Sequence, residues 1–280
     1  MIRIFFILVA VLLLSSGCEE YMDVRFAGES AGHIAVEGGI TTDTAAHWIM
    51  LSMSGDFFEK KPKVMVTNAS ITITDNDNNV FQLTETQPGV YRTDSDVYGI
   101  IGNTYTMNIN LGDTASYQAT ETIRALPDID SIRFEKTTGF DMDAGLTHGY
   151  NLLYYGTEPA GKGDYYFWSL YINNDQYTDS LYKNVFTSDD FVDGNYIKNL
   201  DLFFIPEDDL PADTMYVRLE MFSISEEYYD YIVGLMLETV WKGSPWDGPP
   251  ANAVGNVNND AYGFFTAEDK KTISRLLIKE

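Results

Sequence analysis

The chain has 280 residues, of which 42 are acidic and 18 are basic, and its formal net charge is -24. Such a surface repels phosphate backbones and anionic headgroups, so we exclude nucleic acid as a partner and disfavour flat adsorption onto a membrane. With 45% hydrophobic residues, the chain is long enough and apolar enough for two packed domains.

Residues 1–17 have the order of a secretory signal. Arg3 precedes an apolar run over residues 4–14, and small residues then lead to Cys18, the only cysteine. The run is shorter than the roughly 17–25 apolar residues that span a bilayer, so we expect it to be removed. The order resembles the lipobox of bacterial lipoproteins, in which signal peptidase II cuts before a cysteine that carries diacylglycerol. Ser15 departs from that pattern, which prefers Leu at this place.

The lipobox resemblance implies a lipid on Cys18 and attachment to the outer-membrane bilayer of a Gram-negative bacterium. A lipidated Cys18 leaves no thiol for catalysis. The acidic cluster at residues 19–23 resembles the signal that sends Bacteroidota lipoproteins to the cell surface, so we expect that surface more than the periplasmic face. The alternative is an acidic tether on an acidic protein. Residues 18–32 lack apolar periodicity, which predicts a flexible acidic spacer.

Residues 33–125 have the alternating residue pattern of β-strands separated by turns. Two alternating segments flank an Asp- and Asn-rich turn at residues 75–79, which predicts a β-hairpin. The predicted strands are 33–40, 69–74, 80–84, 90–92, 104–110 and 115–123. Short strands separated by turn residues, with no helical stretch, indicate a β-sandwich of immunoglobulin-like or prealbumin-like type.

Leu126 and Pro127 begin a stiff connector, after which residues 126–280 form a second predicted β-rich domain with one amphipathic helix near 224–240. Ser223 and Glu226 have the spacing of a capping box at the start of that helix. The predicted strands are 131–136, 150–155, 165–173, 214–223, 261–266 and 271–278. Because both alternating sets of residues 165–173 are aromatic or apolar, we expect that strand to be covered on both faces. The predicted fold is therefore mainly β, with two sandwich-like domains in tandem.

Several short motifs follow one another in an order that resembles that of a known family. They include Val36-Glu37-Gly38, Ala69-Ser70-Ile71-Thr72-Ile73, Pro88-Gly89-Val90-Tyr91, Tyr105-Thr106-Met107, Leu126-Pro127 and Gly263-Phe264-Phe265. Together with the lipobox they resemble the Bacteroidota lipoprotein family called domain of unknown function 4249. The resemblance implies an exported two-part β-protein, often encoded near TonB-dependent outer-membrane receptors. It implies no reaction and no functional residues.

Motifs of catalysis are missing from the sequence. No Gly-x-Ser-x-Gly elbow and no His-Glu-x-x-His motif occurs, and the three histidines at positions 33, 47 and 148 are far apart. We therefore predict a protein that is not an enzyme and has no cofactor. With 42 carboxylates, a hydrolase that uses a pair of facing acids stays open, because such a pair is defined by separation in space.

Asp75, Asp77 and Asn79 begin like an EF-hand loop, whose alternating oxygen ligands surround Ca²⁺. Val80 replaces the glycine of that loop and Thr86 its bidentate glutamate, so a simple hairpin turn is the favoured interpretation and calcium the alternative. A second oxygen-rich cluster lies around Gly194 and consists of Asp189, Asp190, Asp193 and Asn195. A solvated acidic loop is favoured there too.

Trp241 and Trp246 flank flexible glycines and precede Asp247, a combination that suits sugar stacking or protein docking; core packing is the alternative.

Three functions are open. The first is a non-catalytic accessory or binding lipoprotein that works with a TonB-dependent transport system and docks on its β-barrel receptor. The second is a surface glycan-binding module, and the third is a carboxylate-dependent hydrolase. We favour the first, because it needs no chemistry that the sequence lacks.

Overall fold

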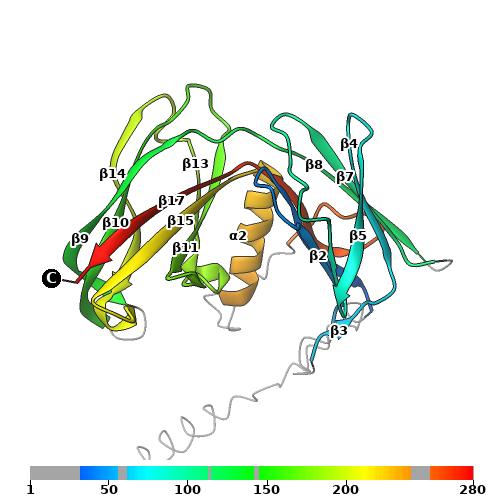
Figure 1. The fold of residues 1–280 in the computed structure, drawn as a ribbon, viewed down its shortest axis with the longest axis horizontal. Coiled ribbons are helices and arrows are strands. Elements are labelled where there is room, and N and C mark those ends of the chain that lie inside the picture. The colour runs from blue at the N-terminus through cyan, green and yellow to red at the C-terminus, as the bar shows by residue number, and fades with distance from the viewer. Residues whose placement is uncertain (1–31, 56–61, 113–114, 142–144, 241–252, 280) are drawn as a thin grey trace, which may run out of the picture.

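Two β-rich units lie side by side, and one helix stands between them (Figure 1). The computed structural model describes residues 32–55, 62–112, 115–141, 145–240 and 253–279. In these ranges strands dominate, and α2 (Glu226–Val240) is the single α-helix. The predicted fold class, mainly β with sandwich-like sheets and one helix, is confirmed.

The first unit is a nine-stranded sheet that curls around one core. Its strands are β1 (Ile34–Thr41), β2 (Trp48–Met53), β3 (Val64–Met65), β4 (Ser70–Asp75), β5 (Val80–Gln87), β6 (Val90–Arg92), β7 (Thr104–Asn110), β8 (Ser116–Thr122) and β16 (Tyr262–Glu268). They follow the order β16-β1-β2-β6-β5-β4-β7-β8, with β3 paired to β2. β16 and β8, at the two ends of this order, also contact each other. Their inward side chains, such as Ile49, Ile73 and Phe265, share one hydrophobic core.

The six strands predicted for this unit are all present within a few residues of the expected bounds, and β4 and β5 form the predicted hairpin. β2 was not predicted. Its inward Ile49 and Leu51 are fully buried, whereas Trp48 on the other face is 40% exposed. Because both faces carry apolar side chains, this strand lacks the alternation that reveals a half-buried strand.

The second unit packs two sheets face to face. Its strands are β9 (Ile129–Asp141), β10 (Gly145–Thr157), β11 (Tyr165–Ile172), β12 (Asp175–Gln176), β13 (Val185–Ser188), β14 (Tyr196–Pro206), β15 (Thr214–Ile224) and β17 (Lys270–Ile278), with short 3-10 turns η1 (Leu181–Lys183) and η2 (Glu207–Asp209). One sheet has the order β14-β10-β9, and the other has β12-β11-β15-β17 with β13 on β11. Leu152, Trp168, Phe203 and Leu219 meet in the core between the sheets.

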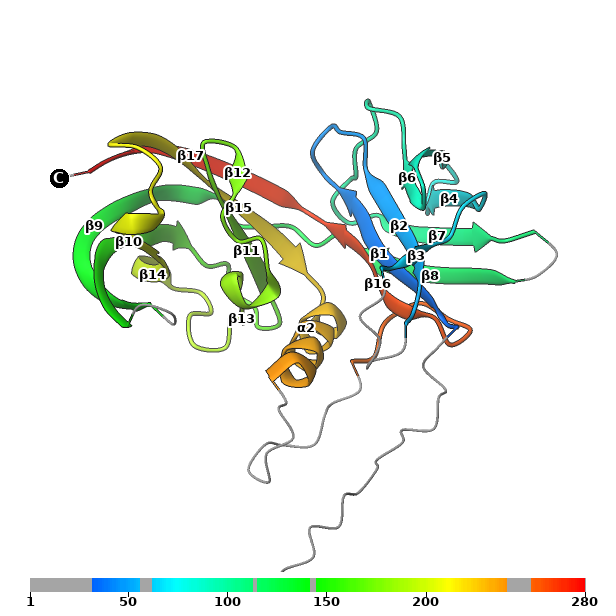
Figure 2. The ribbon, with the colours of Figure 1, turned by 90° about the horizontal axis from the view of Figure 1, so that it is seen from below.

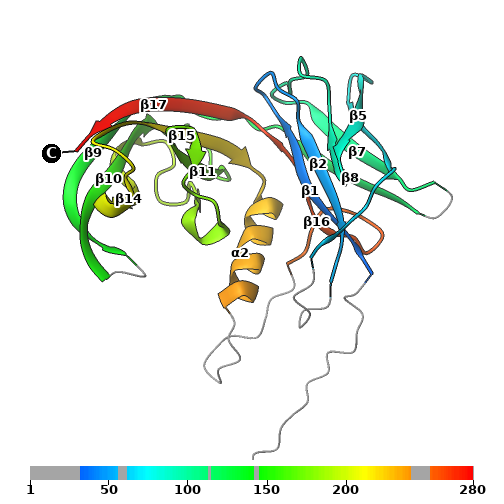
Figure 3. The same ribbon diagram turned by 60° about the horizontal axis from the view of Figure 1, so that its bottom comes forward.

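The chain crosses between the units three times. It passes to the second unit at the predicted connector near Leu126, returns to the first between α2 and β16, and passes to the second again at the turn between β16 and β17. We predicted residues 126–280 as one domain, but β16 pairs in parallel with β1 of the first unit, with Val36 opposite Gly263. β17 then runs across the second unit, as Figures 2 and 3 show. No single cut in the sequence therefore separates the two units.

Asp269 lies in the turn between β16 and β17 and is 3% exposed. Its carboxylate accepts hydrogen bonds from the Thr42 hydroxyl of the first unit at 2.7 Å and from the Leu126 N–H of the connector at 2.8 Å. Its own N–H donates to the Ser223 hydroxyl of β15 at 2.9 Å. One buried residue thus links both units and the connector.

α2 begins where β15 ends. The Ser225 hydroxyl caps the helix by accepting from the Tyr228 N–H at 3.2 Å, and it donates to the Glu121 carboxylate of β8 at 2.8 Å. We predicted Ser223 as the cap, and this was wrong because β15 extends to Ile224 and the Ser223 hydroxyl bonds within the junction. The helix is therefore held to the first unit from its first turn.

Candidate functional site

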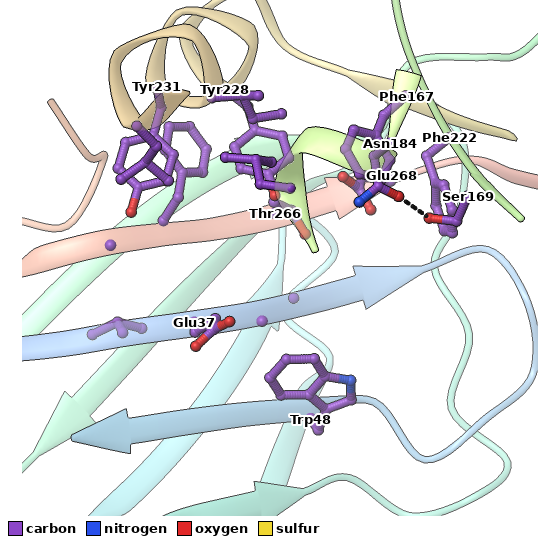
Figure 4. Close-up of a pocket in the computed structure, with 18 of the residues that line it drawn as sticks. Glu37, Trp48, Phe167, Ser169, Asn184, Phe222, Tyr228, Tyr231, Thr266 and Glu268 are labelled. Carbon is purple, nitrogen blue, oxygen red and sulfur yellow. Dashed lines mark hydrogen bonds between the residues drawn. The ribbon is translucent and has the colours of Figure 1, made fainter. Parts of the chain in front are cut away.

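A cleft of about 890 Å³ lies between the two units. The outer face of β1, β2 and β16 forms one wall, and α2 together with the outer face of β11 and β15 forms the other (Figure 4). The volume is within the range typical of small-molecule sites, which are concave and mostly formed before the ligand binds. This cleft is the strongest candidate site among the described residues.

Strand alternation builds the wall on the first unit. Side chains of β16 alternate, so that Phe265 points into the core while Thr266 faces the cleft. Glu37 of β1 and Trp48 of β2 face the cleft in the same way (Figure 4). Gly38, between them, has a φ of +121°, and an added Cβ would lie 2.2 Å from the Trp48 carbonyl oxygen. A glycine is therefore required for the close approach of the two strands beside the indole.

The opposite wall is aromatic. Phe167 of β11 and Phe222 of β15 meet edge to face with ring centres 6.2 Å apart. Tyr228 and Tyr231 of α2 lie against Phe264 of β16, with ring centres at 4.8 Å and 5.5 Å. This aromatic contact closes one end of the cleft and fixes the helix against the first unit.

Both faces of β11 carry aromatic or apolar side chains, and the two faces have different surroundings. Trp168 and Leu170 point into the core between the sheets, whereas Phe167 and Tyr171 face the cleft. We expected a strand covered on both faces. Its outer face is half-buried, because it lines the cleft and does not lie under another sheet.

Acidic side chains outnumber basic ones around the cleft. The carboxylates that line it are Glu37, Asp43, Asp179, Glu220 and Glu268, and the lysines are Lys63 and Lys270. Lys270 lies 3.4 Å from Asp43 and 3.3 Å from Glu220, so it is engaged in ion pairs with both units. The electrostatic field in the cleft therefore disfavours an anionic ligand.

Glu268 is the most perturbed acid of the cleft. It is 9% exposed, and burial together with the nearby Glu121 raises the pKa of its carboxyl to about 8, against the opposing effect of Lys270. A pKa raised in this way favours the protonated carboxyl at neutral pH, a form that can donate a hydrogen bond. Elsewhere in the lining of the cleft, Ser169 donates to the Asn184 side chain at 3.1 Å (Figure 4). The arrangement offers donors and acceptors beside flat apolar rings, which suits binding.

None of the sequence-predicted site residues lines the cleft in the described part of the chain. Cys18, Trp241, Trp246 and Asp247 lie outside the described residues, as do the signal peptide and nearly all of the tether.

Asp75, Asp77 and Asn79 form the turn between β4 and β5. The Asp75 carboxylate is buried and accepts from the N–H groups of Asp77 and Asn79 at 3.0 Å and 2.8 Å, and from the Asn79 amide at 2.9 Å. These contacts are those of a hairpin turn.

The three histidines take separate roles. His47 is 6% exposed, and its ring contacts the Val97 carbonyl. His33 contacts the Asp260 carbonyl at 2.7 Å, and His148 contacts Thr138 on the neighbouring strand at 3.0 Å.

Sequence reasoning missed the cleft residues as a group. Tyr228 and Tyr231 were visible only as the apolar face of a helix, and Trp48 lies on a strand that was not predicted. A usable signal was the doubled aromatic pattern of residues 165–173, since a strand with two apolar faces needs a second partner.

Comparisons with known proteins bear on the family. The family described as Domain of unknown function (DUF4249) matches residues 23–274. A solved two-domain fibronectin type-III segment of chicken tenascin is similar to 88% of this chain and 99% of its own, with 11% identity and a TM-score of 0.21. No curated protein matches the chain. Within the described ranges, no helix has the length and hydropathy to cross a membrane.

Proposed function

We propose that this chain, which belongs to the family described as Domain of unknown function (DUF4249), is a non-catalytic binding lipoprotein that holds a ligand in the cleft between its two units. The observation that carries the proposal is the cleft itself, with aromatic side chains on both walls and volume for a small molecule. The junction at Asp269 and the contact of α2 with Phe264 support a cleft that exists before the ligand arrives.

The ligand is neutral or cationic and has a flat apolar face. Trp48 and Phe222 offer ring faces, and the protonated Glu268 offers a donor. The four other lining carboxylates against two lysines oppose an anion. Glu220 is engaged by Lys270 at 3.3 Å and by Arg218 at 3.1 Å, which favours a positioning role for this carboxylate over a catalytic one.

The place of action is the outer membrane. The order of Arg3, an apolar run and Cys18 supports a lipid anchor, and the acidic residues after it support exposure on the cell surface. There the protein docks on a TonB-dependent β-barrel receptor and presents the ligand to it.

Affinity isolation tests this proposal. The tagged chain is isolated from solubilised outer membranes, and the associated proteins are identified by mass spectrometry. We expect a TonB-dependent β-barrel in the isolate. The Cys18→Ser variant is expected in the soluble fraction and without that partner. An isolate with no β-barrel receptor, or a Cys18→Ser chain that stays in the membrane, contradicts the proposal.

A glycan is the second candidate ligand, because Trp48 is 40% exposed inside the cleft and sugars stack on indole faces. Neutral oligosaccharides are screened by calorimetry against the mature chain. Trp48→Ala is expected to weaken binding at least tenfold, since a stacked aromatic residue at the centre of a site commonly contributes about 2 kcal/mol or more. Tyr216→Ala, a change at a 66% exposed tyrosine outside the cleft, is the matched control. Equal losses in both variants contradict a glycan site here.

A further inference from the structure

Three carboxylates meet at one end of the second unit. Glu158 directly follows β10, Asp164 directly precedes β11, and Asp189 directly follows β13. An oxygen from each lies within 4.8 Å of the others. The ends of three strands therefore bring Asp189 together with Glu158 and Asp164, and none of the three acids lines the cleft between the units.

Two of these acids are almost completely buried. Glu158 is 2% exposed and Asp189 is 1% exposed. Asp189 Oδ1 accepts from the Gly163 N–H at 3.1 Å, while Oδ2 has no hydrogen-bond partner among the described residues. A buried carboxylate oxygen without a donor loses its hydration and gains nothing in return, which costs free energy unless a cation or a proton reaches it.

The charges around the cluster do not cancel. Asp193 adds a fourth carboxylate nearby, and Arg124 is the cation that acts on Asp164. Burial raises the pKa of Glu158 and of Asp164, and the neighbouring carboxylates raise both further. The cluster therefore carries more negative charge than the described side chains around it neutralise.

The loops that supply these acids are tied to each other by backbone contacts. The Gly161 N–H donates to Asp193 Oδ1 at 2.7 Å, the Gly194 N–H donates to the Pro159 carbonyl at 3.2 Å, and the Glu158 N–H donates to Asn195 at 2.9 Å. Gly161 has a φ of +131°, which a side chain would strain. The Tyr166 hydroxyl donates to the Glu158 carboxylate and orients it. A cage of two loops is thus built around the acids.

We propose that Glu158, Asp164 and Asp189 bind a divalent cation of the calcium type, and that the cation fastens loop 158–164 to loop 189–195. Hard oxygen ligands from flexible loops are what Ca²⁺ accepts, and its six to eight ligands leave places for water beside three carboxylates. The site is distinct from the Asp75 turn, whose carboxylate oxygens are already occupied by hydrogen bonds. It does not depend on the function proposed for the cleft.

The test measures cation binding on the mature chain after treatment with a chelator. Calorimetry with Ca²⁺ gives the affinity, and Tb³⁺ luminescence excited through tyrosine and tryptophan reports a site close to Tyr166 and Trp168. Asp189→Asn removes the charge of the carboxylate with the unpartnered oxygen, and Glu158→Gln is a second variant in case the first does not fold. Asp77→Asn, in the exposed hairpin turn, is the matched control.

We expect binding with a Kd of about 1 mM or below, the range of extracellular calcium sites. Asp189→Asn and Glu158→Gln are expected to weaken it at least about tenfold, and Asp77→Asn to leave it unchanged. Ca²⁺ raises the Tm of the parent chain and not that of Asp189→Asn, whereas in chelator Asp189→Asn melts higher than the parent because one buried like charge is gone. A parent Tm that does not respond to several millimolar Ca²⁺, or equal losses in Asp189→Asn and Asp77→Asn, overturns the proposal.

Discussion

Replacing Asp269 with alanine is expected to uncouple the two units. The change removes the acceptor for the Thr42 hydroxyl and for the Leu126 N–H, and Leu126 is only 5% exposed, so its N–H is left buried without a partner. Hydrogen bonds to a charged group contribute roughly 1.5–3 kcal/mol each. Two of them give a loss of about 3–6 kcal/mol, a large share of the roughly 5–15 kcal/mol by which folded domains are stable.

Urea denaturation followed by tryptophan fluorescence measures this loss. We expect the Asp269→Ala transition to shift to lower urea and to split, because the units no longer share a buried link. Asp269→Asn keeps one acceptor oxygen and is expected to fall between the parent and the alanine variant. Asp94→Ala, a change at an exposed aspartate, is the control. A loss for Asp269→Ala within about 0.5 kcal/mol of the Asp94→Ala value would refute the reasoning.

Three further changes test the cleft. The pKa of Glu268 is raised from 4.5 to about 8, so the folded chain holds this proton where the unfolded chain has lost it; its stabilising contribution is complete below about pH 4.5 and is lost as the pH rises toward 8. In thermal scans, the Tm of Glu268→Gln minus the Tm of the parent is therefore expected to be larger at about pH 9 than at about pH 5. An equal Tm difference at the two pH values would contradict this. Gly38→Ala is expected to cost more than ~1 kcal/mol in urea titration, because of its φ of +121° and the 2.2 Å approach to the Trp48 carbonyl, whereas Gly55→Ala, with nothing within 4 Å, is neutral. Phe264→Ala is expected to cost about 3–5 kcal/mol and to speed amide exchange in α2; unchanged exchange there would mean that the helix is held elsewhere.

Local patterns of the sequence were sufficient for most strands. Alternating residues such as those of β4 and β7 bury Ile71, Ile73 and Met107 on one face, and this periodicity is independent of what the sheet packs against. β12, β13 and β14 were not predicted. β14 spans Tyr196–Pro206 and begins with charged, exposed residues before its buried end, so no regular alternation marks it.

The pairing of strands that are distant in the sequence could not be predicted from such local patterns. The residues of β16 predict a strand, but nothing in Gly263 or Phe265 specifies that it lies in parallel beside β1. The cleft depends on that pairing, because it places Thr266 and Glu268 next to Glu37 and Trp48. The meeting of Glu158, Asp164 and Asp189 could not be predicted from the sequence either. Asp189 was noted as part of an acidic loop, but Glu158 and Asp164 reach it only through the arrangement of β10, β11 and β13.

The return of β16 to the first unit also sets an order of events in biogenesis. Thr42 and Asp269 are 227 positions apart, and the core beside β1 stays open until the strand before Asp269 arrives. A chain that crosses a membrane with its N-terminus first would therefore expose the edge of β1 during most of its passage. Such long-range closure is slow, and an open strand edge invites aggregation. The first unit can therefore complete its core only when nearly the whole chain is available.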